Sequence, residues 1–202
     1  MIDLFIKGGL LMWPLAILSV VALAVILERE FFFLRNRISD SSLNELKEQV
    51  IVGSIDKAAG ITYSSDRLLF RFLRSVFNNR TRDIDLAEKE ISLEGNKLLF
   101  TATRFIHVLE LIGSVSPMIG LSGTVVGMVR AFQQIGITSS SSIDPSLLAD
   151  GIWVAMITTV AGLFVAIPSL IFAHINNARI KKIAFNMKIY GEEINTLLRS
   201  SQ

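Results

Sequence analysis

The sequence predicts an all-α integral membrane protein with three transmembrane helices. Of its 202 residues, 51% are hydrophobic and only 19% are charged, and the mean hydropathy of +0.53 lies far above that of soluble domains. Apolar runs occupy residues 8–27, 111–129 and 151–173. At a rise of about 1.5 Å per residue, each run can cross most or all of a hydrocarbon core of roughly 30 Å.

The first run, residues 8–27, is expected to be a retained membrane helix and not a signal peptide. It is long for a signal-peptide core, and its one A-x-A motif, at Ala22 and Ala24, lies inside the run instead of after it. Pro14 is tolerable because it lies about one turn from the start, and Trp13 beside it suits a membrane interface.

The basic residues indicate how the chain is oriented. Lys7 is the only basic residue before the first run, and Arg130 is the only one between the second and third runs. The segments that flank the other ends of the runs contain Arg29, Arg35, Arg37, Lys47, Lys89, Lys97, Arg104, Arg179, Lys181, Lys182 and Lys188. The positive-inside rule then places residues 1–7 and 130–150 outside, and residues 28–110 and 174–202 in the cytoplasm.

The second and third runs each carry a face of small residues. Between residues 110 and 130 this face comprises Gly113, Ser116, Gly120, Gly123, Thr124 and Gly127. In residues 151–173 it comprises Gly151, Ala155, Thr158, Thr159, Gly162, Ala166, Ser169 and Ala173. Because small residues at steps of three and four let two backbones approach, the two runs are predicted to pack as a hairpin.

The cytoplasmic segments are predicted to be helical. Apolar residues recur at helical spacing from Ile84 to Ile112 with no proline before Pro117, so the second membrane helix should begin well inside the cytoplasm. A stripe in residues 180–198 should continue the third helix, which Pro168 bends without ending. A short amphipathic helix is expected at residues 68–77.

Turn-forming residues predict where other elements begin and end. Gly53 and Gly60 are expected in loops, and so are the paired asparagines at residues 78–79. Asp144 followed by Pro145 predicts a helix that starts there and runs into the third span.

The sequence contains no residue pattern that indicates catalysis, cofactor binding or nucleic-acid binding. Cysteine is absent, no paired carboxylates or phosphate-cradling loop are present, and a net charge of +2 is too small to indicate nucleic acid. His107 and Glu110, three residues apart, can in principle share a metal, but an interfacial polar pair is the favoured interpretation. The same interpretation holds for His174.

Hydroxyl groups inside the spans leave ion passage as the chemistry to consider. Thr124 and Thr159 lie about six and eight residues from the outer surface, or roughly 9 and 12 Å, so they can share one layer. The alternative is that each hydroxyl bonds the carbonyl one turn back in its own helix. Further candidates for a polar pathway are Thr158, Ser116, Ser122 and Ser169. No acid or base lies inside the three spans, so a proton carrier must come from elsewhere.

Two stretches resemble signatures of a known family. Residues 117–132, PMIGLSGTVVGMVRAF, are similar to the second-helix signature of the MotA/TolQ/ExbB proton-channel family, and residues 151–168, GIWVAMITTVAGLFVAIP, to its third-helix signature. Their order and spacing also match. Three spans and a short chain resemble the ExbB/TolQ branch and not the four-helix flagellar stator.

The resemblance implies an assembly and a mechanism. It implies a pentamer of this chain in the bacterial inner membrane, with the N-terminus periplasmic and the C-terminus cytoplasmic, and a pore lined by Thr124 and Thr159. An ExbD/TolR-like partner with a single span supplies an intramembrane aspartate, and proton flow turns the ring around it to drive a TonB/TolA-like effector. Helix packing is expected at Gly120, Gly123, Gly127, Gly162, Pro117 and Pro168.

One position departs from the family pattern. Many ExbB and TolQ members have a glutamate where this chain has Val154. Either the partner's aspartate suffices, or the pathway differs, or the chain is a non-conducting relative. The first is favoured, because valine removes an expensive buried charge while the hydroxyl layer stays intact.

Two other functions compete with the channel interpretation. A membrane scaffold would assemble an envelope complex without moving ions, and only a flux measurement separates it from a channel. A solute transporter is disfavoured, because three spans show no inverted repeat and no pair of broken helices. Whether uptake, envelope maintenance or motility is energised depends on partners that the sequence does not contain.

Overall fold

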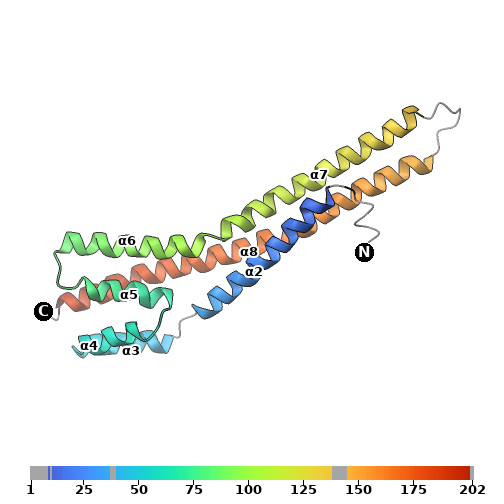
Figure 1. The fold of residues 1–202 in the computed structure, drawn as a ribbon. Helices are drawn as coiled ribbons and strands as arrows, with labels where there is room; N and C mark the ends of the chain where they lie inside the picture. Colours follow the sequence, from blue (N-terminus) through green and yellow to red (C-terminus); the bar gives the residue numbers. More distant parts are fainter. Residues whose placement is uncertain (1–8, 10, 37–39, 138–144, 201–202) are drawn as a thin grey trace. The chain divides into compact units, whose positions relative to one another are not determined.

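All the regular structure in the described part of the chain is helical, which confirms the all-α class. The computed structural model describes residues 9, 11–36, 40–137 and 145–200, and every regular element in these ranges is an α-helix (Figure 1). The helices are α2 (Met12–Arg35), α3 (Asp40–Ile51), α4 (Ile55–Tyr63), α5 (Leu68–Asn78), α6 (Ile84–Thr103), α7 (Ile106–Ile137) and α8 (Pro145–Ser200).

The helices form two compact units, which are described separately. The apolar unit comprises Met1–Glu28 and Phe105–Ile175, and the polar unit comprises Arg29–Arg104 and Asn176–Gln202. Both α2 and α8 contribute to each unit, because their residue ranges extend across the division.

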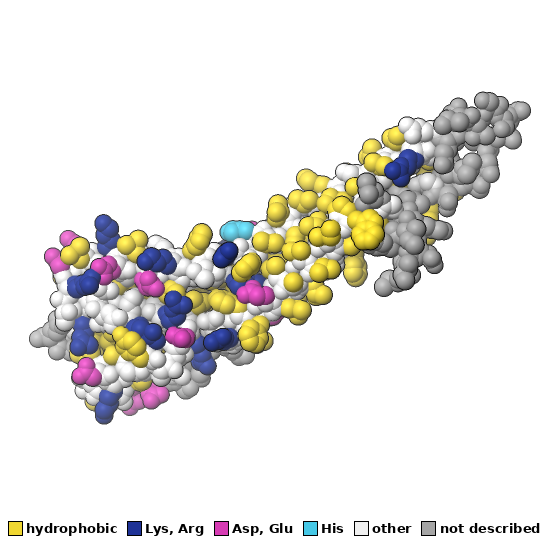
Figure 2. Space-filling model, viewed as in Figure 1, with side chains coloured by type: hydrophobic (Ala, Val, Ile, Leu, Met, Phe, Trp, Pro, Cys, Tyr) yellow, Lys and Arg dark blue, Asp and Glu magenta, His cyan; other side chains and the backbone are white. Residues whose placement is uncertain are grey.

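The apolar unit presents large hydrophobic side chains on its surface. Figure 2 shows them clustered on the visible face of this unit. More than half exposed are Trp13, Ile17, Val20, Leu23 and Leu27 of α2, Leu111, Met118, Leu121, Val125 and Phe132 of α7, and Trp153, Met156, Val160, Phe164, Ile167 and Ile171 of α8. Such a surface suits contact with lipid or with other apolar helices.

Two stretches of the described chain are long and apolar enough to cross a membrane. They are Ile84–Gln133, which contains α6 and most of α7, and Gly151–Leu198 within α8. The predicted span at residues 8–27 corresponds to α2 from Met12 onward, and residues 1–8 lie outside the described part of the chain. The third crossing, the span limits and their orientation therefore stay predictions.

A turn divides the helix that was predicted to run without interruption from Ile84. Helix α6 ends at Thr103 and α7 begins at Ile106, so the prediction of one continuous helix is wrong at Arg104 and Phe105. The last carbonyls of a helix lack a partner within it. The carbonyl of Ala102 is one of these, and it accepts a hydrogen bond of 2.9 Å from Nη1 of the buried Arg29.

Helix α8 confirms three predictions. It begins at Pro145, it continues through Pro168, and it extends to Ser200 as one helix of 56 residues. Asp144, the predicted cap, lies outside the described residues. In the tail, the predicted stripe faces the core of the polar unit, with buried side chains at Ile180, Met187, Ile194 and Leu198.

The polar unit is a helical bundle in which consecutive helices pack on each other, α3 on α4, α4 on α5 and α5 on α6. Helix α5 confirms the amphipathic helix predicted at residues 68–77. Its Phe72 ring is buried against two glycines, because a Cβ on Gly95 of α6 or on Gly191 of α8 would lie only 3.1 or 2.9 Å from it. Glycine at both positions lets this ring fill the centre of the unit.

The loop predictions for glycine met different outcomes. Gly53, with a φ of +79°, lies in the turn between α3 and α4, as predicted. The prediction for Gly60 is wrong, because this residue lies inside α4. Buried Ala58 and Thr62 on either side anchor the helix to the bundle, and this packing outweighs the low helix propensity of glycine. Helix α5 ends at Asn78, as its asparagine pair predicts.

Candidate functional site

The centre of the apolar unit is a direct contact between the backbones of α7 and α8. A Cβ built on Gly120 would lie 2.9 Å from the carbonyl oxygen of Thr158, and one on Gly162 would lie 2.6 Å from that of Ser116. Real Cβ atoms do not approach backbone this closely, so only glycine permits the spacing. The two small-residue faces are thus placed against each other.

The contact continues in both directions along the two helices. Toward the end of α7, a Cβ on Gly127 would lie 3.0 Å from Cβ of Ala155, and one on Gly151 would lie 2.5 Å from Cβ of Ala131. Sequence reasoning missed Ala131, although it lies four residues after Gly127 and continues the same face. A Cβ on Gly123 would overlap the side chain of Thr158.

Two adjacent threonines of α8 lie at the level of these glycines. Thr159 Oγ1 donates to the carbonyl oxygen of Gly120 at 3.2 Å and so links the two helices. Thr158, which is 1% exposed, donates to Ala155 in its own helix at 2.7 Å and lies 3.4 Å from the same Gly120 oxygen. In helix α7 that carbonyl is also the regular acceptor for the backbone N–H of Thr124. The hydroxyl of Thr159 and the backbone N–H of Thr124 therefore share one acceptor.

The other hydroxyls bond within their own helices. Thr124, half-buried, donates to Leu121 at 2.6 Å, exposed Ser122 donates to Met118 at 2.8 Å, and buried Ser169 donates to Val165 at 2.8 Å. Within one chain, these contacts follow the local-bonding alternative. A role in lining a pore depends on neighbouring chains and stays a prediction for all of these residues.

Ser116 differs from the other hydroxyls because it is fully buried and finds no hydrogen-bond partner among the described residues. Pro117 follows it and has no N–H to offer to the carbonyl of Gly113 one turn back. Pro168 affects the carbonyl of Phe164 in α8 in the same way. The two prolines interrupt the backbone ladder of their helices without ending them.

The predicted spans contain no side chain that titrates near neutral pH. No ionisable residue occurs between Glu110 and Arg130 or within residues 151–173. Val154 lies in α8, and its side chain is outside the described part of the structure. The site can exchange hydrogen bonds between hydroxyls and carbonyls, but it has no proton carrier of its own.

His107 and Glu110 form an exposed polar pair at the start of α7. His107 Nδ1 lies 3.1 Å from Glu110 Oε2. Among the described residues, no third histidine, cysteine, aspartate or glutamate joins them to form a metal-binding group. His174 is exposed in α8.

Comparison with known proteins assigns the fold to a family. Residues 64–189, which include both small-residue helices, match the model of the MotA/TolQ/ExbB proton channel family. The chain belongs to this family. Within it, the chain is 32% identical to the putative biopolymer transport protein ExbB-like 1 of Synechocystis over 173 residues, covering 85% of this chain and 68% of that protein.

Other relatives place the chain in the ExbB/TolQ branch of the MotA/TolQ/ExbB family. It is 31% identical to the biopolymer transport protein exbB1 of Vibrio cholerae, over 80% of this chain and 72% of that protein. It is 26% identical to the Tol-Pal system protein TolQ of Haemophilus influenzae, over 98% of this chain and 92% of that protein. The chain is thus an ExbB/TolQ-like membrane protein of a transport family and not of an enzyme family.

The polar unit contains a cluster of polar side chains that was not predicted from the sequence. Arg179 Nη1 pairs with Glu30 Oε1 at 2.7 Å and donates to Oδ1 of Asn176 at 3.2 Å. Asn176 is fully buried, and its Nδ2 has no partner among the described residues. The sequence did contain a signal for this cluster. In both α2 and α8, charged or amide residues occur within two turns after the end of an apolar run.

Proposed function

We propose that this chain is the proton-channel subunit of an ExbB/TolQ-like motor complex in the bacterial inner membrane, where it uses the proton-motive force to energise a partner process. The observation that supports this most directly is the α7–α8 interface, where the Thr159 hydroxyl bonds the Gly120 carbonyl one turn before Thr124. The interface lies within the residues that match a proton channel family. A chain with a hydroxyl layer but no internal acid suits a channel whose carrier is supplied from outside.

The proposed assembly is a pentamer around an ExbD/TolR-like companion that has one membrane helix and an aspartate within it. Proton flow through this assembly then drives a TonB/TolA-like effector. The names of the relatives, biopolymer transport and Tol-Pal system proteins, support this assignment. The exposed hydrophobic side chains of α7 and α8 offer surfaces for neighbouring copies, for the companion helix and for lipid.

A second exposed stripe supports assembly through the polar unit. Leu86, Leu93 and Phe100 of α6 are 60%, 51% and 75% exposed and recur at every seventh residue. This spacing keeps them on one face of the helix, opposite the buried Ala87, Leu98 and Ala102 side of α6. A helix of another copy can cover this stripe.

The proposed topology has three crossings. Residues 8–27, of which those from Met12 onward lie in α2, form the first, residues 111–129 the second and residues 151–173 the third. Residues 1–7 and 130–150 are then periplasmic, and residues 28–110 and 174–202 are cytoplasmic. In this arrangement the polar unit lies on the cytoplasmic side.

Valine at position 154 is compatible with conduction if the companion's aspartate alone carries the proton. The test is proton uptake into liposomes that contain the purified complex with its companion. The companion's intramembrane aspartate is changed to asparagine in a parallel sample. We expect uptake from the unaltered complex and a fall to the level of protein-free liposomes in the variant, because the titratable carrier is lost.

A non-conducting scaffold is the competing proposal, and the same liposomes separate the two. A scaffold predicts no proton uptake above protein-free liposomes even when the companion is intact. That result, obtained with a complex shown to be assembled, would replace the channel assignment with the scaffold.

A further inference from the structure

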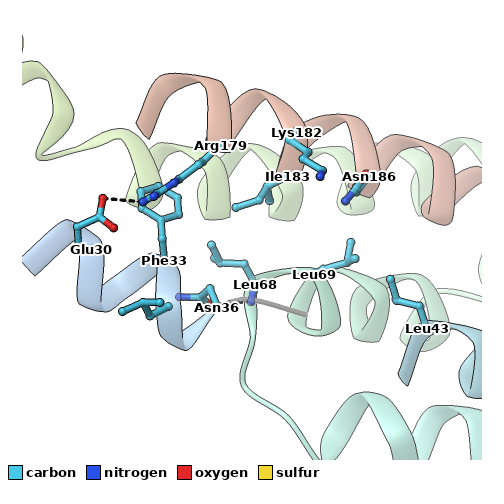
Figure 3. Close-up of a pocket in the computed structure, with 11 residues that line it drawn as sticks. Glu30, Phe33, Asn36, Leu43, Leu68, Leu69, Arg179, Lys182, Ile183 and Asn186 are labelled. Carbon is cyan, nitrogen blue, oxygen red and sulfur yellow. Dashed lines mark hydrogen bonds and ion pairs between the residues drawn. The ribbon is translucent and has the colours of Figure 1, made fainter. Parts of the chain in front are cut away.

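A cavity in the polar unit combines charged, amide and apolar side chains. It has a volume of about 470 Å³ and lies between the end of α2, the start of α5 and the part of α8 that follows Asn176. Figure 3 shows Lys182 and Asn186 extending from α8 into this cavity, opposite Leu68 and Leu69 of α5. The remaining lining residues are Glu30, Phe33, Leu34, Asn36, Leu43, Arg179 and Ile183.

The charges of the cavity leave one cation available for a ligand. Arg179 is already paired with Glu30 at 2.7 Å, and its guanidinium lies 5.5 Å from the centre of the Phe33 ring. Asn36 is also engaged, since it donates to the Phe32 carbonyl and accepts from the N–H of Leu68. By contrast, Lys182 makes no ion pair with any residue that the structure describes. The cavity therefore offers one net positive charge.

The apolar part of the lining disfavours a purely inorganic anion as the ligand of this cavity. Six of the eleven lining residues are apolar, and an isolated phosphate would leave their surface exposed to water. A ligand with one negative charge and a hydrophobic portion satisfies both halves. Phospholipids with a single net charge have this composition, and basic pockets on the cytoplasmic side of membrane helices bind anionic lipid head groups.

By their position along the two helices, Glu30 and Arg179 lie near the lipid head-group layer, and the side chain of Lys182 can reach back toward it. In α2, Glu30 follows the last apolar residue of the run, Leu27, by about 4.5 Å. In α8, Arg179 lies about 9 Å after Ala173, and Lys182 lies about 13.5 Å after Ala173. Side chains of a helix lean toward its N-terminus, so the long side chain of Lys182 leans back toward the apolar run.

We infer that this cavity binds an anionic phospholipid, with the phosphate at Lys182 and the apolar portion against Phe33 and Leu34. The inference rests on the proposed membrane crossing of α2 and α8. The lipid would contact both α2 and α8 just beyond the membrane, beside the Glu30–Arg179 ion pair, and so stabilise their packing.

Native mass spectrometry of the full chain in detergent, with phosphatidylglycerol added, tests the inference. We expect the Lys182→Gln variant to bind phosphatidylglycerol about tenfold more weakly than the unaltered chain, because a charge-assisted hydrogen bond is lost. The Lys182→Arg variant should restore binding. Lys181→Gln is the matched control, because Lys181 is the neighbouring exposed lysine and does not line the cavity.

Two further probes distinguish the ligand class. Phosphatidylcholine, which has no net charge, should bind equally weakly to all variants, and inorganic phosphate should not displace phosphatidylglycerol. Equal binding of phosphatidylglycerol to the Lys182→Gln and Lys181→Gln variants would overturn the inference, as would displacement by inorganic phosphate. The readout does not involve proton movement, so its failure is distinct from a failure of the proposed channel.

Discussion

Thr159 forms the shorter of the two hydroxyl hydrogen bonds that join the two small-residue helices. Its hydroxyl donates to Gly120 of the other helix, whereas the hydroxyl of Thr124 donates to Leu121 one turn back. Both threonines share the Gly120 carbonyl, one through its side chain and the other through its backbone N–H. In the proposed pore, removing either hydroxyl takes one polar group out of the layer, but only the Thr159 hydroxyl also contributes a contact between helices.

Replacing either threonine with valine tests this layer. Thr124→Val and Thr159→Val keep the shape of the side chain and remove its hydroxyl. We expect proton uptake in liposomes to fall about tenfold in each, the change that corresponds to roughly 1.4 kcal/mol in the barrier, a typical value for one hydrogen bond. Thr159→Ser should keep most of the uptake.

Ser114→Ala is the control for these substitutions. Ser114 is exposed in α7 and donates to Leu111, so it also bonds one turn back, but it lies outside the proposed layer. The copy number of the complex should stay unchanged in all variants. Full uptake in both valine variants would remove Thr124 and Thr159 from the pathway.

At the scale of elements, the glycine contact should determine how firmly α7 and α8 pack. Gly162→Ala places a methyl group 2.6 Å from the Ser116 carbonyl oxygen and 3.2 Å from Cα of Gly120. Backbone atoms cannot move aside as a flexible side chain can. We expect the free energy of unfolding to fall by about 1–3 kcal/mol, as overpacking typically costs, measured by thermal unfolding in detergent.

Gly60→Ala provides the matched control within the same chain. Gly60 is also inside a helix, but a Cβ there would meet nothing within 4 Å. Alanine should therefore leave the free energy of unfolding unchanged or raise it by about 0.5–1 kcal/mol, because it favours the helix. If both variants unfold at the same temperature, the backbone contact between α7 and α8 is not what holds the two helices together.

The elements with local signals were predictable from the sequence. Pro145 marks the first residue of α8, Pro168 lies inside that helix without ending it, and the amphipathic pattern gives α5 almost to the residue. These features depend on residues within one or two turns of each other. Local chemistry is enough to determine them.

The features that were missed depend on residues far apart in the chain. The turn after Thr103 is accompanied by a hydrogen bond from Arg29, which is 73 residues from its acceptor Ala102. The leucine that fills the space over Gly113, Leu170, lies in a different helix. The spacing of small residues predicted a close approach of α7 and α8. Which threonine bridges them, Thr159 and not Thr124, depends on how each helix is rotated about its own axis, and the spacing does not determine this rotation.

At the scale of the whole molecule, the chain divides its tasks between two units. The apolar unit contains the hydroxyl layer and a hydrophobic surface, and the polar unit contains a bundle with ion pairs such as Lys47–Glu193 at 2.7 Å. Within the spans of the apolar unit, the sequence has no acid or base to carry a proton. In the proposed channel the proton carrier therefore comes from a companion, and the exposed stripes are proposed to contact further copies.

Native mass spectrometry of the complex, extracted gently from its own membrane, tests this requirement most directly. It counts the copies of this chain and weighs any companion. We predict a pentamer together with a small protein that has one membrane helix and an aspartate within it. A monomer or dimer without a companion would contradict the account, because the small-residue helices would then pack only each other and no carrier would be present.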